Sequence, residues 1–80
     1  MLPDRQAEAR RDFSRLVELS PDDSPRKAKS LLQLGRLCAK DKDLAQARQH
    51  LLDARAIDRR IDVFTQDERT EITKILEPMP

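Results

Sequence analysis

Two apolar patterns of helical spacing, joined by the short turn Lys40-Asp41-Lys42, constrain this chain more than any other feature. Helices connected by so few residues have no room to diverge, so they must fold back on each other. The turn therefore predicts an all-α fold of antiparallel helix hairpins, with one hairpin at its centre.

The composition also favours helices. Aromatic residues make up only 2% of the sequence, which contains 1 Gly. Strands are rich in aromatic and β-branched residues, whereas this chain is rich in Ala, Leu, Arg, Gln, Lys and Glu, which favour helices. Because the chain has 80 residues, 38% of them hydrophobic, we expect one small domain over residues 1–80, with only a few kcal/mol of net stability.

The charges nearly balance, with 16 Lys and Arg against 15 Asp and Glu, so no strong field attracts an anionic partner. Arg5, Arg10, Arg11 and Arg15 form a local basic group. The one aromatic residue among them, Phe13, belongs to the apolar face of the predicted helix and is not available to stack on bases, so we do not expect nucleic acid as a partner. A single cysteine, Cys38, excludes an internal disulfide and suits a reducing compartment. No apolar run is long enough to span a bilayer, and no signal-peptide pattern opens the chain. We therefore expect a cytoplasmic protein that does not contact a membrane.

Capping residues and prolines predict four helices, at about 4–19, 25–39, 44–59 and 66–77. Leu2-Pro3-Asp4 and Ser24-Pro25 each combine a proline with a residue that caps free backbone N–H groups, as at the start of a helix. The remaining boundary signals are two pairs with capping-box spacing, Asp43 with Gln46 and Thr65 with Glu68, and two stops, Ser20-Pro21-Asp22-Asp23 after the first helix and Pro78 after the last.

Helical spacing gives each predicted helix an apolar face. The band on the second helix is the widest, so we expect neighbours on two of its sides. In chain order, the apolar faces comprise Ala9, Phe13, Leu16, Val17 and Ser20; then Ala28, Leu31, Leu32, Leu34, Gly35, Leu37 and Cys38; then Leu44, Ala47, Leu51, Ala54 and Ile57 or Asp58; and finally Ile72, Ile75 and Leu76.

The only glycine, Gly35, lies inside the second predicted helix. Glycine in a helix interior costs about 1 kcal/mol relative to alanine, so it usually has a packing reason. Two closely packed helices need a small residue where their backbones approach. We therefore expect Gly35 and Ala47 to mark the close approach within the hairpin.

The spacing Leu31-x-x-Leu34-Gly35, followed by Ala47, Leu51 and Ala54, resembles the tetratricopeptide repeat, a helix-turn-helix unit. These six residues are the predicted packing positions of the repeat. The segments Ala7-Glu8-Ala9-Arg10 and Ala45-Gln46-Ala47-Arg48 share a pattern, so the first helix resembles the second helix of a preceding repeat. Cys38 and Arg59 stand where the family usually has a large residue and a proline.

The resemblance implies about one and a half repeats, with a full repeat at 25–59 and a capping helix at 66–77, forming a fragment of a right-handed superhelix. It also implies a non-catalytic scaffold that binds a peptide or partner helix through the first helix of the hairpin. The stripe formed by Lys29, Gln33, Arg36 and Lys40 on that helix is mostly cationic. We expect it to bind an acidic protein segment, the alternative being an ordinary solvated helix face.

A second hypothesis is a small domain for homo-oligomerisation. Leu32 and Leu52 lie beside the predicted core stripes, and Leu37 extends the apolar edge of the second helix. These leucines are either covered within the chain or contact a second copy in a homodimer.

The sequence does not favour catalysis. The only histidine, His50, and the only cysteine, Cys38, lie on different predicted helices without a recognisable third member, so we predict no catalytic residues. One His and one Cys cannot supply the usual set of zinc ligands, and no Asp-rich calcium loop is present. We therefore expect no metal and no cofactor.

Overall fold

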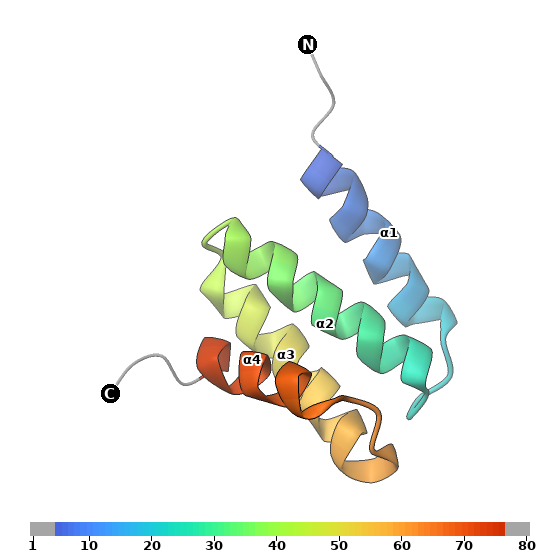
Figure 1. The fold of residues 1–80 in the computed structure, drawn as a ribbon. Coiled ribbons are helices and arrows are strands. Elements are labelled where there is room, and N and C mark those ends of the chain that lie inside the picture. The colour runs from blue at the N-terminus through green and yellow to red at the C-terminus, as the bar shows by residue number, and fades with distance from the viewer. Residues whose placement is uncertain (1–4, 77–80) are drawn as a thin grey trace.

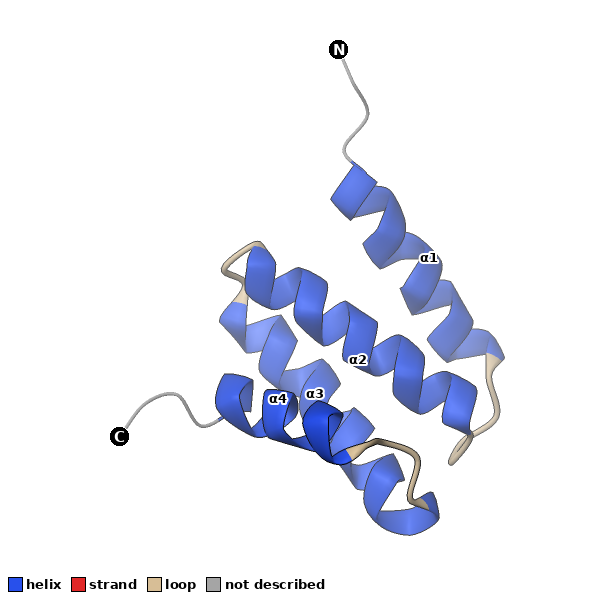
Figure 2. Ribbon diagram, viewed as in Figure 1, coloured by secondary structure: helices blue, strands red, loops and turns tan. Residues whose placement is uncertain are grey.

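The computed structural model describes residues 5–76, which form four α-helices and contain no strand (Figure 2). The helices are α1 (Arg5–Leu19), α2 (Pro25–Lys40), α3 (Leu44–Ile61) and α4 (Gln66–Leu76). The predicted all-α fold is confirmed. The expected cap at Asp4, the last residue of the 66–77 helix and the stop at Pro78 lie outside the described residues.

The helices pack in chain order as adjacent antiparallel pairs (Figure 1). Helix α2 lies between α1 and α3, so the expectation of neighbours on two sides of this helix is confirmed. Helix α4 packs on α3 and returns toward α2. None of the helices in residues 5–76 is long and apolar enough to cross a membrane.

The helix starts follow from local hydrogen bonds. Ser24 caps α2, with its hydroxyl accepting the N–H of Lys27 at 3.1 Å, and Pro25 takes the first helical position. Before α4, Thr65 N–H donates to Glu68 Oε1 at 2.9 Å, and Glu68 N–H donates to Thr65 Oγ1 at 3.2 Å. The capping box predicted at Thr65 is therefore complete in both directions.

The capping box predicted at Asp43 forms only in part. The Asp43 carboxylate accepts the N–H of Gln46 at 3.4 Å, while the backbone N–H of Asp43 donates to the carbonyl of Cys38 at 2.8 Å. Helix α3 extends two residues past the predicted end at Arg59, to Ile61. It ends where Asp62 adopts a left-handed conformation with φ 54°, a position usually taken by glycine or asparagine.

The core lies between α2, α3 and α4. Phe64, in the loop before α4, joins it although the sequence pattern did not assign it to any buried face. The main cluster contains Ala28, Leu31, Leu32, Leu51, Ala54, Ile57, Phe64, Ile72 and Leu76. Leu32 is thus covered within the chain.

Two expectations about buried positions are wrong. Leu44 is 55% exposed, because it lies in the first turn of α3 beside the connecting turn of the hairpin, where no other helix covers it. Leu16 is 38% exposed, because α1 packs mainly against α2 and buries only a narrow strip. None of the α1 side chains that the structure describes is fully buried.

Gly35 marks a close approach of α2 and α3. A Cβ atom at this position would lie 2.4 Å from Cδ2 and 2.5 Å from Cγ of Leu51, far inside ordinary contact distance. The three nearest atoms all belong to Leu51, so this side chain, rather than Ala47, occupies the space that the glycine leaves. All six predicted packing positions, Leu31, Leu34, Gly35, Ala47, Leu51 and Ala54, are buried.

Candidate functional site

The stripe predicted on α2 is divided in its middle. Lys29 and Lys40 are exposed and Gln33 is half-buried. None of these three side chains forms a hydrogen bond or ion pair within residues 5–76. Arg36 instead donates two hydrogen bonds to Glu71 of α4, from Nε to Oε2 at 2.8 Å and from Nη2 to Oε1 at 2.6 Å. These bonds lower the pKa of the Glu71 carboxyl and tie α4 to α2. Glu71 thus neutralises the charge of Arg36 and occupies two of its N–H donors.

A carboxylate in the last part of α3 organises the junction with α4. Asp58 Oδ1 accepts the backbone N–H groups of Val63 and Phe64, both at 2.9 Å. The guanidinium of Arg69 donates to Oδ2 from Nε at 2.8 Å and to Oδ1 from Nη2 at 3.1 Å, and Nη2 also donates to Asp62. Asp58 thus fixes the loop after α3 and the first turns of α4.

The same contacts explain the titration of Asp58. The hydrogen bonds from Arg69, helped by the backbone N–H groups of Phe64 and Val63, lower the pKa of this carboxyl to about 2 against the opposing effect of burial. A carboxylate near a helix C-terminus is disfavoured by the helix dipole, and Arg69 offsets that cost. Asp58 is therefore charged at neutral pH, and its oxygens are occupied.

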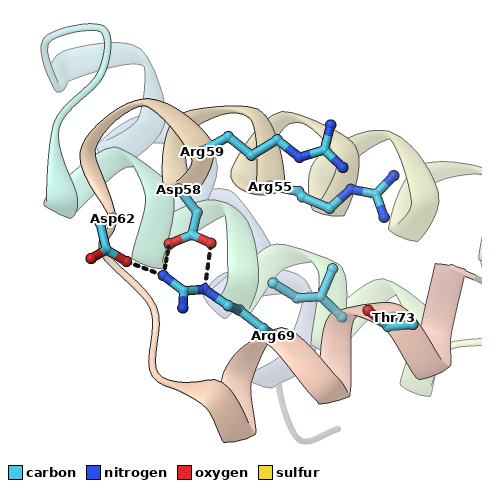
Figure 3. A pocket seen from close by; sticks show the side chains of 7 residues that line it. Arg55, Asp58, Arg59, Asp62, Arg69 and Thr73 are labelled. Atoms are coloured by element: carbon cyan, nitrogen blue, oxygen red, sulfur yellow. Dashed lines mark hydrogen bonds and ion pairs between the residues drawn. The ribbon is translucent and has the colours of Figure 1, made fainter.

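Arg69 leaves two neighbouring arginines without a partner. Asp58 lies three residues after Arg55 within α3, and Asp62, the residue that follows α3, lies three residues after Arg59, so the sequence spacing makes each the expected ion-pair partner. Both carboxylates bind Arg69 instead. The side chains of Arg55 and Arg59 form no hydrogen bond or ion pair with any described residue. In Figure 3 no dashed line reaches either of them.

These two arginines line an open cleft of about 440 Å³ between α3 and α4 (Figure 3). The α3 wall carries Arg55 and Arg59, and the α4 wall carries Arg69 and Thr73. The complete lining is Arg55, Asp58, Arg59, Asp62, Arg69, Ile72 and Thr73. We call this the arginine cleft; its three arginines outnumber its two aspartates by one, so its net charge is positive.

The chemistry available in the arginine cleft is anion binding. A guanidinium presents a planar fork of N–H donors that matches a carboxylate or phosphate, and the free Arg55 and Arg59 can each supply one. The Thr73 hydroxyl, on the opposite wall, can donate another hydrogen bond. The lining contains no histidine or cysteine, and no group of metal-binding side chains is found among residues 5–76.

The histidine and cysteine lie elsewhere. Cys38 is buried on α2, and burial raises the pKa of its thiol, so it is protonated at neutral pH. His50, on α3, is half-buried, and burial lowers the pKa of its imidazole. Arg10 interacts with the Cys38 thiol and opposes part of the rise in its pKa, whereas the His50 side chain forms no hydrogen bond with a described group.

The basic group predicted on α1 is also divided. Arg10 forms ion pairs with Asp41 at 3.3 Å and Asp43 at 3.5 Å, which tie α1 to the turn between α2 and α3. Arg11 and Arg15 are exposed and have no partner within the described chain. They share the i, i+4 spacing of Arg55 and Arg59 but line no cleft, which makes them a matched control.

A second hollow, between α1, α2 and α3, shows what sets the arginine cleft apart. It is lined by Val17, Asp22, Asp23, Lys27, Leu31, Asp53, Ala56, Ile57 and Arg60. Its cations are already paired, Lys27 with Asp22 and Arg60 with Asp23. It therefore offers no free cation to a ligand.

Sequence reasoning did not find the arginine cleft. In the sequence Arg55, Asp58, Arg59 and Asp62 alternate in charge at spacings that predict ion pairs within one helix. The residue that competes for these aspartates, Arg69, belongs to a different predicted helix, so the spacing within one helix does not reveal it. Comparisons of the chain with protein-family models, with curated proteins and with solved structures found no match. The geometry of the cleft is thus the basis for a functional proposal.

Proposed function

We propose that this chain is a non-catalytic protein-interaction module that binds an acidic segment of a partner protein in the arginine cleft. One observation carries the proposal: Arg55 and Arg59 line the same cleft and have no counter-ion within residues 5–76. Adjacent like charges on a helix cost a few tenths of a kcal/mol, a cost that a bound carboxylate would remove.

The proposed architecture is that of a tetratricopeptide-type scaffold. The α2–α3 hairpin would be the repeat, α1 the second helix of a preceding repeat and α4 a capping helix. The spacing of Leu31, Leu34, Gly35, Ala47, Leu51 and Ala54 supports it, as do the antiparallel neighbours and the approach of Leu51 to Gly35. The stripe on α2 is a second contact surface through Lys29, Gln33 and Lys40. Its fourth member, Arg36, is ion-paired with Glu71.

Fluorescence anisotropy with a fluorescein-labelled glutamate-rich peptide tests the proposal. The double variant Arg55→Gln/Arg59→Gln should weaken binding by about tenfold or more, since two charge-assisted contacts are removed. The control variant Arg11→Gln/Arg15→Gln loses the same charge and should leave the affinity within about twofold. Equal losses in the two variants would show that only net charge matters, and would refute a site at the cleft.

Self-association is a second candidate function, favoured by the exposed leucines of α1. Leu16 and Leu19 lie one turn apart and are 38% and 75% exposed. Light scattering over a wide concentration range separates the candidates. A dimer that dissociates on Leu16→Gln/Leu19→Gln substitution supports self-association, whereas a monomer at all concentrations excludes it.

A further inference from the structure

One face of α3 continues the arginine cleft along the helix. Leu44, Arg48, Leu52, Arg55 and Arg59 fall within an arc of about 80° at 100° per residue, over a length of about 22 Å. We call these five residues the α3 face. Four of them are exposed and Arg55 is half-buried.

The α3 face combines unpaired cations with uncovered apolar side chains. Arg48, like Arg55 and Arg59, makes no hydrogen bond or ion pair with a described residue. Leu44 is 55% exposed and Leu52 41% exposed. Asp58 and Asp62, each three residues from an arginine of this face, are both bound by Arg69, and neither forms an ion pair with the face.

We propose that the α3 face, together with the arginine cleft, binds an acidic amphipathic helix of a partner protein. This inference rests on the proposed function and names the class of ligand. Charge complementarity requires carboxylates opposite Arg48, Arg55 and Arg59. Leu44 and Leu52 require apolar side chains between those carboxylates, because covering the exposed leucines lowers the free energy of the complex.

The spacing of the α3 face selects a helical ligand. Its residues recur at i, i+4, i+8, i+11 and i+15 on one helix, so a second helix lying alongside presents complementary side chains at the same intervals. An extended strand alternates its side chains between two faces and rises about 3.3 Å per residue, so it matches this spacing poorly. The opposite wall of the cleft, on α4, adds the polar side chain of Thr73.

A second copy of this chain fits the α3 face less well. The exposed side of α1 carries Leu16 and Leu19 with the acidic residues Glu8 and Asp12. Arg5 and Arg15 lie on the same side, so its charges cancel. The three arginines of the α3 face need an excess of acid that α1 does not supply.

The experiment compares two labelled peptides by fluorescence anisotropy. The first is an alanine-based helix with glutamates and leucines on one face at the spacing of the α3 face. The second has the same residues with a central alanine replaced by proline, which breaks the helix. We expect the proline peptide to bind at least about tenfold more weakly, because the helix must then be lost or distorted.

Variants of the intact chain assign the site. Leu52→Gln should weaken binding of the helical peptide about threefold to tenfold, while the control Leu19→Gln, at another exposed leucine, should leave it unchanged. Both positions are exposed, and circular dichroism checks that both variants stay folded. Loss of binding in Arg55→Gln/Arg59→Gln but not in Arg11→Gln/Arg15→Gln completes the assignment.

The outcomes separate this inference from the proposed function. Equal affinity for the helical and proline peptides, with the arginine effect retained, would overturn the helical ligand and leave the acidic-segment proposal standing. Unchanged binding in Arg55→Gln/Arg59→Gln would overturn both. A concentration-dependent dimer that Leu52→Gln dissociates would also overturn this inference, because a second copy would then occupy the α3 face.

Discussion

Replacing Gly35 by alanine should destabilise the α2–α3 hairpin, although alanine is the better helix former. Alanine gains about 1 kcal/mol of helix propensity at an interior position. Its Cβ, however, would lie 2.4 Å from Cδ2 and 2.5 Å from Cγ of Leu51, a side chain with 0% exposure. Ordinary carbon contacts are ~3.5–4.0 Å, and overpacking costs about 1–3 kcal/mol. The net expectation is a loss of about 1 kcal/mol in the free energy of unfolding.

A second substitution should reverse the sign of this effect. Leu51→Ala alone removes a buried side chain and costs about 2–5 kcal/mol. In the Leu51→Ala background, the three atoms nearest to a Cβ at Gly35 are gone, so Gly35→Ala keeps its helix propensity and fills part of the cavity. The double variant should therefore be more stable than Leu51→Ala by about 1 kcal/mol, a coupling of about 2 kcal/mol.

Urea unfolding followed by circular dichroism measures the four free energies of this cycle. Because the domain is small, all four proteins are measured in the same buffer containing trimethylamine oxide, which strengthens effective burial and keeps Leu51→Ala folded. If Gly35→Ala stabilises the chain equally in both backgrounds, Leu51 moves aside without cost. The close approach at Gly35 would then not constrain the hairpin, and the reasoning would be refuted.

Three further predictions concern the polar contacts between elements. The pKa of Asp58 falls from 3.8 to about 2 on folding, so its contribution to the free energy of unfolding is fully present above pH ~4 and is lost as the pH falls toward 2. Allowing for the partial exposure of Arg69, we expect this contribution to be about 1–2 kcal/mol when urea unfolding is measured across this pH range. Asp58→Asn should remove this pH dependence. A double-mutant cycle of Arg36→Gln and Glu71→Gln should give a coupling of about 0.5–1 kcal/mol, since both side chains are half-exposed; a zero coupling would mean that this pair does not fix α4. Thr65→Ala removes the hydroxyl that caps α4 and should lower the free energy of unfolding by about 1 kcal/mol, whereas Thr65→Ser should preserve it.

Much of the fold is determined by interactions between residues close in sequence. Ser24, Asp43 and Thr65 precede helices in the sequence, and each caps one in the structure. The short turn after α2 forces the hairpin, and Gly35 lies where α2 and α3 approach closely. These features could be predicted because capping, helical periodicity and turn length act within a few residues of chain.

The sequence was less informative at the edges of the packing. It assigned Leu44 and Leu16 to buried faces, but periodicity cannot say whether another helix covers the end of a stripe. It also gave no sign that Phe64, in a loop, would enter the core. Burial at these positions depends on where the neighbouring helices end.

The candidate site was decided by the tertiary structure. From the sequence, Arg36 belongs to a free cationic stripe, and Arg55 and Arg59 have acidic partners three residues away. Packing of α4 reverses both assignments, because Glu71 binds Arg36 and Arg69 binds the two aspartates near Arg55 and Arg59. The sequence by itself determines which charges are near one another along a helix. Which of them remain free depends on the side chains that a distant helix brings to compete for the same partners.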